Sequence, residues 1–361
     1  MIGEGAAPHR FLQPALYRGA VLRFPSLPPN HREADFYILR ILFITSTRVG
    51  DAVLSTGLLG HLVETHPGAR MTVVCGPPAA SLFRAVPGLE RVIVMAKRPL
   101  SGHWPRLWGQ VVGRRWDLVV DLRNSPVSRL LVKGRLAVPP REGRGGTHQV
   151  ERLARTLGLS PPPSPRLWFS GADRAKAAEL VPPGPPVLAL APVANWAGKT
   201  WPVDRFADLA HRLTAPDGIL PGARVMVLGT EGERAKAGPL LDAVEPGRRI
   251  DLMGRTDPLE AGACLTRCAL FIGNDSGLMH IAAAVGVPTL GLFGPSRSDR
   301  YGPWGAHAAF VEGSLGYDQI TTAPGFSFQA ATSFMGSLSV DAVAGAARVL
   351  WEKQIPRVIP S

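Results

Sequence analysis

The sequence predicts an α/β fold built from two similar halves, each with its own parallel sheet. Apolar runs of strand length alternate with segments of helical periodicity, and this alternation occurs twice along the 361 residues. A chain of this length exceeds one usual domain. Its most Pro-rich zone, residues 161–186, predicts a linker. We therefore expect one domain at 38–160 and a second at 187–338, followed by a closing amphipathic segment at 339–361.

The first half reads as strand and helix in turn. Residues 1–37 have no firm period and predict an N-terminal extension, and 139–149 read as a loop. We expect strands at 41–45, 71–75, 92–95 and 118–121, and helices at 52–64, 107–112, 127–132 and 151–157.

The second half repeats this order. We expect residues 312–338 to be irregular. We expect strands at 187–191, 223–228, 270–273 and 289–293, and helices at 203–213, 234–243, 257–267 and 340–351.

Several protein classes are disfavoured. No apolar run approaches the about 18–20 residues of a membrane helix, and the N-terminus lacks a signal-peptide core, so we expect a cytoplasmic protein. Neither a G-x-G-x-x-G fingerprint nor a P-loop is present, which argues against a nicotinamide oxidoreductase or a P-loop ATPase. The cysteines Cys75, Cys264 and Cys268 lack zinc-site spacing and read as reduced structural thiols. We expect no metal and no cofactor.

Positive charge is confined to the first half. Residues 1–170 hold 23 Lys and Arg against 10 Asp and Glu, whereas residues 171–361 are almost balanced, with 17 against 18. Such a basic half predicts an anionic partner: nucleic acid, an acidic membrane surface or a large phosphorylated substrate. Nucleic acid is disfavoured because no aromatic stacking segment or known binding motif accompanies the charge. Simple solubility is the alternative.

The stretch with the densest chemistry runs from 270 to 295 and reads LFIGNDSGLMHIAAAVGVPTLGLFGP. Its pattern is strand, polar turn, helix, strand, so the turn lies where a helix N-terminus can receive an anion such as phosphate. Asp275, Ser276, Gly277 and His280 come together there. An ordinary helix cap with a surface histidine explains the same spacing equally well.

Other polar turns follow strands elsewhere in the chain. Asp51 precedes a helix and is either an N-cap or a carboxylate placed to take a proton. Lys199 stands between two tryptophans in a rigid loop, where it is either a solvated lysine or a phosphate ligand. Glu231 and Glu233 begin a helix, which the helix dipole alone can explain.

Four motifs, taken in order, resemble one family. They are RVGDAVLSTGLLGHL at 48–62, WAGKTWPVDRFADLAHRL at 196–213, GTEGERA at 229–235 and GNDSGLMHIAAAVGVPTLGLFGP at 273–295. Together they resemble the heptosyltransferase family, glycosyltransferase family 9, over about residues 38–352. The resemblance implies a GT-B fold, with two Rossmann-like domains facing across a cleft and the last helix returning to the first domain. It also implies inverting, metal-independent heptose transfer from an ADP-sugar to the lipopolysaccharide inner core.

The resemblance also implies residue roles. Asp51 matches the general base. Lys199 matches the lysine on the donor phosphates, and Asp275 matches the carboxylate near the donor sugar. Either Glu231 or Glu233 matches a glutamate near the nucleotide ribose, and the local spacing leaves both open. The turn residues Ser276, Gly277 and Leu278 match the diphosphate cradle, and His280 matches the histidine beside sugar and phosphate.

The same resemblance implies a role for the basic half. The first domain would bind an anionic glycolipid acceptor at the cytoplasmic face of the inner membrane. Two alternatives stay open: the same fold with another nucleotide sugar and another surface glycan, or a non-catalytic relative that only binds the nucleotide sugar. The predicted acceptor contacts are Arg48, Arg114, Arg115, Arg129, Lys133, Arg135, Arg141 and Arg144.

Overall fold

The computed structural model describes residues 38–97, 99–141 and 146–354. The extension predicted for residues 1–37, and Arg144 among the predicted acceptor contacts, lie outside the described residues.

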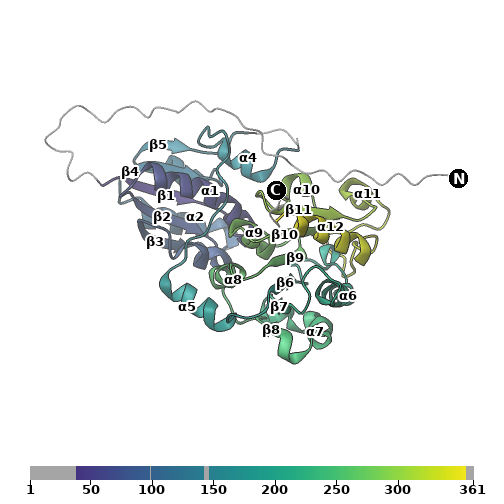
Figure 1. Ribbon diagram of the computed structural model, residues 1–361. Helices are drawn as coiled ribbons and strands as arrows, with labels where there is room; N and C mark the ends of the chain where they lie inside the picture. Colours follow the sequence, from purple (N-terminus) through teal and green to yellow (C-terminus); the bar gives the residue numbers. More distant parts are fainter. Residues whose placement is uncertain (1–37, 98, 142–145, 355–361) are drawn as a thin grey trace, which may run out of the picture.

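Two parallel sheets confirm the predicted fold class. The first has the strand order β3-β2-β1-β4-β5 and the second has the order β11-β10-β9-β6-β7-β8, and every strand pair in both is parallel. Figure 1 shows the first sheet in purple and blue and the second in green and yellow. The strands are β1 Arg40–Ile44, β2 Arg70–Cys75, β3 Leu89–Val94, β4 Trp116–Asp121, β5 Lys133–Ala137, β6 Val187–Ala191, β7 Arg224–Val227, β8 Arg249–Asp251, β9 Leu270–Asn274, β10 Thr289–Phe293 and β11 Ala308–Glu312.

Helices connect consecutive strands and cover the sheets. Between the two sheets, α1 contacts α9, while α8 contacts both α5 and the short helix η2 (Figure 1). The α-helices are α1 Val49–Thr65, α2 His103–Val111, α3 Pro126–Arg129, α4 Gln149–Ala154, α5 Gly171–Leu180, α6 Val203–Thr214, α7 Arg234–Ala243, α8 Pro258–Leu265, α9 Gly277–Ala284, α10 Ser298–Tyr301, α11 Tyr317–Thr321 and α12 Val340–Glu352. The 3-10 helices are η2 Pro77–Phe83, η3 Pro99–Ser101, η4 Ala197–Lys199, η5 Glu231–Glu233 and η6 Pro246–Arg248.

The central strands are apolar on both faces because helices cover both. β6 reads VLALA and β10 reads TLGLF, and every residue of both is buried. One apolar cluster continues from the first domain into the second, since it holds Leu59 of α1 together with Ile281 of α9. The outer faces of the two sheets carry separate clusters. The facing layers of the two domains thus share a core, which fixes how their loops meet.

The last helix corrects one expectation. Helix α12 packs on α6, β10 and β11, which all belong to the second domain, and not on the first domain as the resemblance implied. The cause is its apolar stripe of Val343, Ala347 and Leu350, which joins the outer core of the second sheet.

Some elements were not predicted. Residues 171–180, inside the predicted linker, form the helix α5, which Ser170 caps reciprocally with Asp173. The strands β5, β8 and β11 are edge strands, and their polar or small residues hide the strand pattern. The segment expected to be irregular also contains α11.

The order of the strands locates the place for a ligand. In the first sheet the strand order reverses between β1 and β4, because β2 and β3 are added on one side of β1 and β4 and β5 on the other. In the second sheet it reverses between β6 and β9 in the same way. Open parallel sheets bind ligands beyond the carboxyl ends of the strands at such reversals. The loops after β1, β4, β6 and β9 are therefore the candidate site.

Candidate active site

Three of the predicted site residues come from these loops. Asp51 lies in the first turn of α1, directly after β1. Lys199 ends the 3-10 turn η4 after β6, and Asp275 follows β9. The two sheets thus bring together a residue from near position 50 and residues from near positions 200 and 275.

The N-termini of α1 and α9 touch through glycines. A Cβ atom on Gly50 would lie 2.8 Å from the His280 ring, and one on Gly277 would lie 2.8 Å from Cγ1 of Val49. Atoms that close would have to move, so the absence of both side chains permits the contact. Gly277, which the motif suggested for a turn, also serves the meeting of the two domains.

Lys199 and Asp275 form a half-buried ion pair. Lys199 Nζ donates to Asp275 Oδ2 at 3.1 Å, and the two side chains are 17% and 11% exposed. The lysine is therefore held in place by the carboxylate before any ligand arrives. An ammonium so placed at a helix N-terminus can neutralise a phosphate.

His280 is neutral at physiological pH. Its ring is almost fully buried, and burial lowers the pKa of His280 to about 4 against the opposing effect of Asp275. Its Nε2 lies 4.0 Å from Asp275 Oδ1, while its Nδ1 is buried without a hydrogen-bond partner. The ring can offer a neutral hydrogen bond to a ligand, and it does not supply charge.

Asp51 has the electrostatics of a proton acceptor. Burial raises the pKa of the Asp51 carboxyl above its ordinary value, and the nearby charge of Asp275 raises it further. The charges of Arg48 and Arg152 and the Ser46 hydroxyl, 3.4 Å from Asp51 Oδ2, act in the opposite direction. Asp51 makes no side-chain cap for α1, whose first turn has none. This geometry disfavours the simple N-cap interpretation.

Polar atoms without partners gather on the second domain's loops. The Ser276 hydroxyl is buried, makes no cap hydrogen bond and has no partner. The Trp196 indole nitrogen after β6 and the Ser296 hydroxyl after β10 are also buried and unpartnered. Buried polar groups normally find partners, so these three could form hydrogen bonds with a polar ligand. Leu278 is half-buried beside them in the first turn of α9.

The two predicted glutamates differ in availability. Glu233 accepts hydrogen bonds from the backbone N–H and the hydroxyl of Thr230, both at 2.8 Å, and so completes a capping box. Glu231 pairs only at the surface with Arg234, and its side chain is 70% exposed. Of the two, Glu231 has the carboxylate that is free to turn toward a nucleotide.

The predicted acceptor contacts do not form one surface. Lys133 lies opposite Trp116, at the amino end of β4, and Arg114 pairs with Glu90 near the amino end of β3. Asp51 lies at the other end of the sheet, and the five residues along β4 correspond to about 16 Å. Arg115 precedes β4 with Arg114, and Arg135 lies along β5. Arg48 is the predicted contact beside Asp51; Arg129 ends α3 and Arg141 follows β5.

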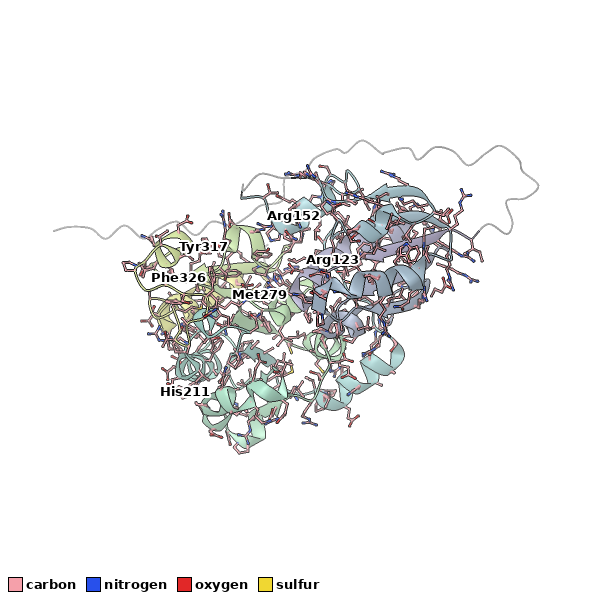
Figure 2. All side chains as sticks on the ribbon, turned by 180° about the vertical axis from the view of Figure 1, so that it is seen from behind. Arg123, Arg152, His211, Met279, Tyr317 and Phe326 are labelled. Carbon is pink, nitrogen blue, oxygen red and sulfur yellow. The ribbon has the colours of Figure 1, made fainter. Side chains whose placement is uncertain are left out.

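Two arginines that the sequence interpretation missed lie nearer. The charge of Arg152 on α4 acts on Asp51. Arg123 follows β4 and stacks over the Trp104 ring at 5.1 Å, while its Nη1 is buried without a partner. Figure 2 labels both, with Met279 of α9, near the middle of the molecule. Only the position of Arg123, two residues beyond a strand end, could have identified it.

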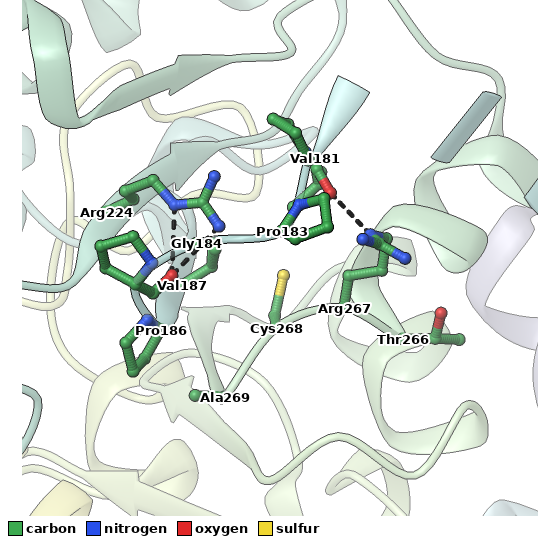
Figure 3. Close-up of a pocket in the computed structure, with 12 residues that line it drawn as sticks. Val181, Pro183, Gly184, Pro186, Val187, Arg224, Thr266, Arg267, Cys268 and Ala269 are labelled. Carbon is green, nitrogen blue, oxygen red and sulfur yellow. Dashed lines mark hydrogen bonds between the residues drawn. The ribbon is translucent and has the colours of Figure 1, made fainter. Parts of the chain in front are cut away.

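One pocket among the described residues lies away from these loops. It has a volume of about 330 Å³ and is lined by residues around Val187 and Arg224, which begin β6 and β7. Arg224 donates to the Pro185 carbonyl and Arg267 to that of Val181, as Figure 3 shows. This pocket is at the amino ends of the strands, and the site loops are at the other end.

Neither a metal-binding cluster nor a membrane-spanning helix occurs among the described residues. No group of three or more His, Cys, Asp or Glu side chains there could hold a metal ion. Within the same residues, no helix is both long and apolar enough to cross a bilayer.

The two parallel-sheet domains have the GT-B fold, which is one of the folds of glycosyltransferases. The family model for glycosyltransferase family 9 (heptosyltransferase) matches residues 141–319. A lipooligosaccharide heptosyltransferase 2 from Haemophilus influenzae is 34% identical over 306 residues, covering 73% of this chain and 86% of that protein. This chain belongs to glycosyltransferase family 9, and the predicted family and enzyme class are confirmed.

Other relatives agree. A lipopolysaccharide heptosyltransferase 1 from Pseudomonas aeruginosa is 26% identical, covering 74% of this chain and 82% of that protein. The structure of an E. coli ADP-heptose lipopolysaccharide heptosyltransferase II has a TM-score of 0.69 at 20% identity, covering 88% of this chain and 99% of the other. At that identity the likeness establishes the fold alone.

Proposed function

We propose that this protein transfers a heptose from ADP-heptose to the inner core of a lipopolysaccharide, with inversion at the anomeric carbon and without a metal ion. The observation that carries the proposal is that a carboxylate of the first domain lies near an ion pair of the second. Asp51 of the first domain faces the Lys199–Asp275 pair of the second, closely enough for the two carboxylates to interact. We infer the heptose and the lipopolysaccharide acceptor from the names of the relatives, which are heptosyltransferases.

The second domain would hold the donor. Lys199 would neutralise the diphosphate and stabilise it as it leaves, in the place that a metal ion takes in other transferases. Ser276, Gly277 and Leu278 would present the N-terminus of α9 to the same phosphates. His280, being neutral, would donate or accept one hydrogen bond at the sugar. Glu231 is the better placed of the two glutamates for the ribose.

The first domain would activate the acceptor. Asp51 would take the proton of the acceptor hydroxyl while the oxygen attacks the anomeric carbon on the face opposite the diphosphate. The pKa of Asp51, raised by burial, makes it a stronger base than an exposed carboxylate. Arg48 and Arg152 would bind acidic groups of the acceptor beside that hydroxyl.

The membrane is the second partner in this proposal. Anionic lipid attracts basic protein surfaces, and the excess charge of the chain lies in its first half. We expect binding to vesicles that contain anionic phospholipid, and we expect it to weaken as salt is raised. Vesicle binding that is insensitive to ionic strength would remove this part of the proposal.

A ligand screen tests the proposal. Thermal unfolding is followed with ADP, UDP, GDP and ADP-heptose, and a ligand at 100 times its dissociation constant adds about 2.7 kcal/mol to stability. We expect ADP and ADP-heptose to stabilise and the others not to. Stabilisation by a different nucleotide would indicate another donor, and binding without turnover would indicate a non-catalytic relative. Turnover with ADP-heptose should survive a chelator and invert the anomeric configuration.

A further inference from the structure

Aromatic side chains from two distant parts of the chain pack together beside the turn that carries Lys199. They are Trp196, next to the turn, and three phenylalanines of the segment between β11 and α12. The Trp196 ring centroid lies 5.4 Å from that of Phe328, 6.0 Å from Phe334 and 6.1 Å from Phe326. Phe326 also lies 4.8 Å from Phe328 and 5.1 Å from Phe334, so it touches all the others. We call this group the aromatic cluster.

The cluster is joined to the turn by its backbone as well as its rings. The backbone N–H of Phe334 donates to the carbonyl of Gly198 at 2.9 Å. The Trp196 ring lies so close over Gly198 that a Cβ there would be 2.3 Å from it. Residue 198 is the one directly before Lys199. A segment more than 120 positions later in the sequence therefore holds the turn from outside.

The turn is short, and beyond it the Trp201 N–H is anchored separately by donating to Asn274 Oδ1 at 2.9 Å. Helix η4 has three residues, and the Trp196 carbonyl accepts its closing hydrogen bonds from Lys199 N–H and the Thr200 hydroxyl. Lysine has a long, flexible side chain, so the position of its ammonium depends on where its backbone is held. Asp275 holds the ammonium from one side, and the aromatic cluster holds the backbone from the other.

We propose that the aromatic cluster is a positioning element for Lys199, and that Phe326 at its centre sets how well the protein binds the donor diphosphate. This inference rests on the proposed function for the identity of the ligand of Lys199. The phenylalanines touch the turn and not the reacting atoms, so they are positioning residues. Figure 2 labels Phe326, which lies in the second domain.

The first experiment needs no donor. Lysines of the full-length protein are labelled with trace acetic anhydride, and the rate at each is read by peptide mass spectrometry. Lys199 is 17% exposed and paired, so it should label slowly in the wild type. Phe326→Ala should make it label severalfold faster, while Lys176, paired with Glu260 at 2.8 Å, keeps its rate. An unchanged Lys199 rate in a folded Phe326→Ala protein overturns the proposal.

Two further variants serve as controls. Leu315→Ala removes an exposed apolar side chain of the same segment that lies outside the cluster, and it should leave the Lys199 rate unchanged. Phe326→Leu keeps an apolar side chain at the same place and should give a rate near that of wild type. If Phe326→Ala does not fold, the test uses Phe328→Ala, because Phe328 is 63% exposed. For Phe328→Ala we again expect faster labelling of Lys199, and an unchanged rate again overturns the proposal.

The second experiment is a double-mutant cycle on ADP binding. Phe326→Ala should weaken binding by about tenfold when Lys199 is present and have little effect in the Lys199→Ala protein. Equal losses in both backgrounds would mean that Phe326 acts on the nucleotide independently of Lys199, and would overturn the proposal. If the wild type does not bind ADP, the proposed donor is wrong, and the labelling result still decides the positioning role.

Discussion

The two domains present opposite chemistry at the place where they meet. The first offers a half-buried carboxylate, Asp51, whose neighbours are the Ser46 hydroxyl at 3.4 Å and the charges of Arg48 and Arg152. The second offers a cation, Lys199, that is already paired with Asp275 and supported from behind by aromatic rings. One side is arranged to take up a proton, and the other to hold a fixed negative charge. The difference suggests a division of labour that mutations can separate.

The largest expected effect comes from Asp51→Asn. The amide keeps the size of the side chain but cannot accept a proton, so kcat should fall by about 10²- to 10⁴-fold. Asp275→Asn is the matched control on the second domain, and it should act mainly on the KM of the donor because it releases Lys199. Steady-state kinetics with both variants check this. If Asp275→Asn instead loses kcat and Asp51→Asn does not, the two roles must be exchanged.

The next effect is expected from Lys199→Ala. Hydrogen bonds to charged groups contribute about 1.5–3 kcal/mol, so the donor KM should rise by about 10- to 100-fold. Lys176→Ala, which removes another paired lysine, on α5, is the control and should leave the KM unchanged. Kinetics at varied donor concentration make the comparison. A loss confined to kcat would place Lys199 in the chemical step and not in donor binding.

A smaller effect should follow from adding a side chain at the close contact between α1 and α9, where the two domains meet. Gly277→Ala places a Cβ 2.8 Å from Val49 Cγ1, and such overpacking typically costs about 1–3 kcal/mol. Gly238→Ala in α7 is the control, because nothing lies within 4 Å of its Cβ and alanine favours helix by about 0.5–1 kcal/mol. Denaturant unfolding measures both. Equal stability of the two variants would argue against close packing of α1 on α9.

The smallest expected effect is a change in how the stability of the folded protein depends on pH when Asp51 is replaced. The folded protein raises the pKa of Asp51, so between pH 3.8 and that raised value the native state binds more protons than the unfolded chain. The contribution of Asp51 to stability is therefore lost as pH rises through this window. Asp51→Asn should melt slightly above wild type at pH 7 and not at pH 3. A lower melting temperature at pH 7 would mean that the ionised carboxylate is stabilised.

The sequence predicted most of the central strands and helices, because a parallel sheet covered on both faces leaves apolar runs such as VLALA of β6. It missed β5 and β8, whose residues KGRLA and RID are largely polar or partly exposed. It also missed α5, where prolines on both sides suggested a linker. Edge and linker elements are stabilised by tertiary contacts that a local pattern does not reveal.

The candidate site was predictable in part. Motif order identified Asp51, Lys199 and Asp275, since each follows a strand that the pattern also predicts. Arg152 and the aromatic cluster could not be predicted, because their relevance depends on contacts between positions far apart in the chain. The basic residues of the first half were grouped by charge alone, and the sheet register then separated Lys133 from the end of the sheet that carries Asp51. Net charge does not show where each charged residue lies, whereas the strand register places it at one end of the sheet.

The division of labour is tested most directly by calorimetric titration of ADP into three proteins: wild type, Asp51→Asn and Lys199→Ala. The account predicts that Asp51→Asn binds ADP within about twofold of wild type, and that Lys199→Ala binds it at least about tenfold more weakly. Equal weakening in both variants would contradict it, because Asp51 would then be a donor ligand and the two domains would not have separate roles.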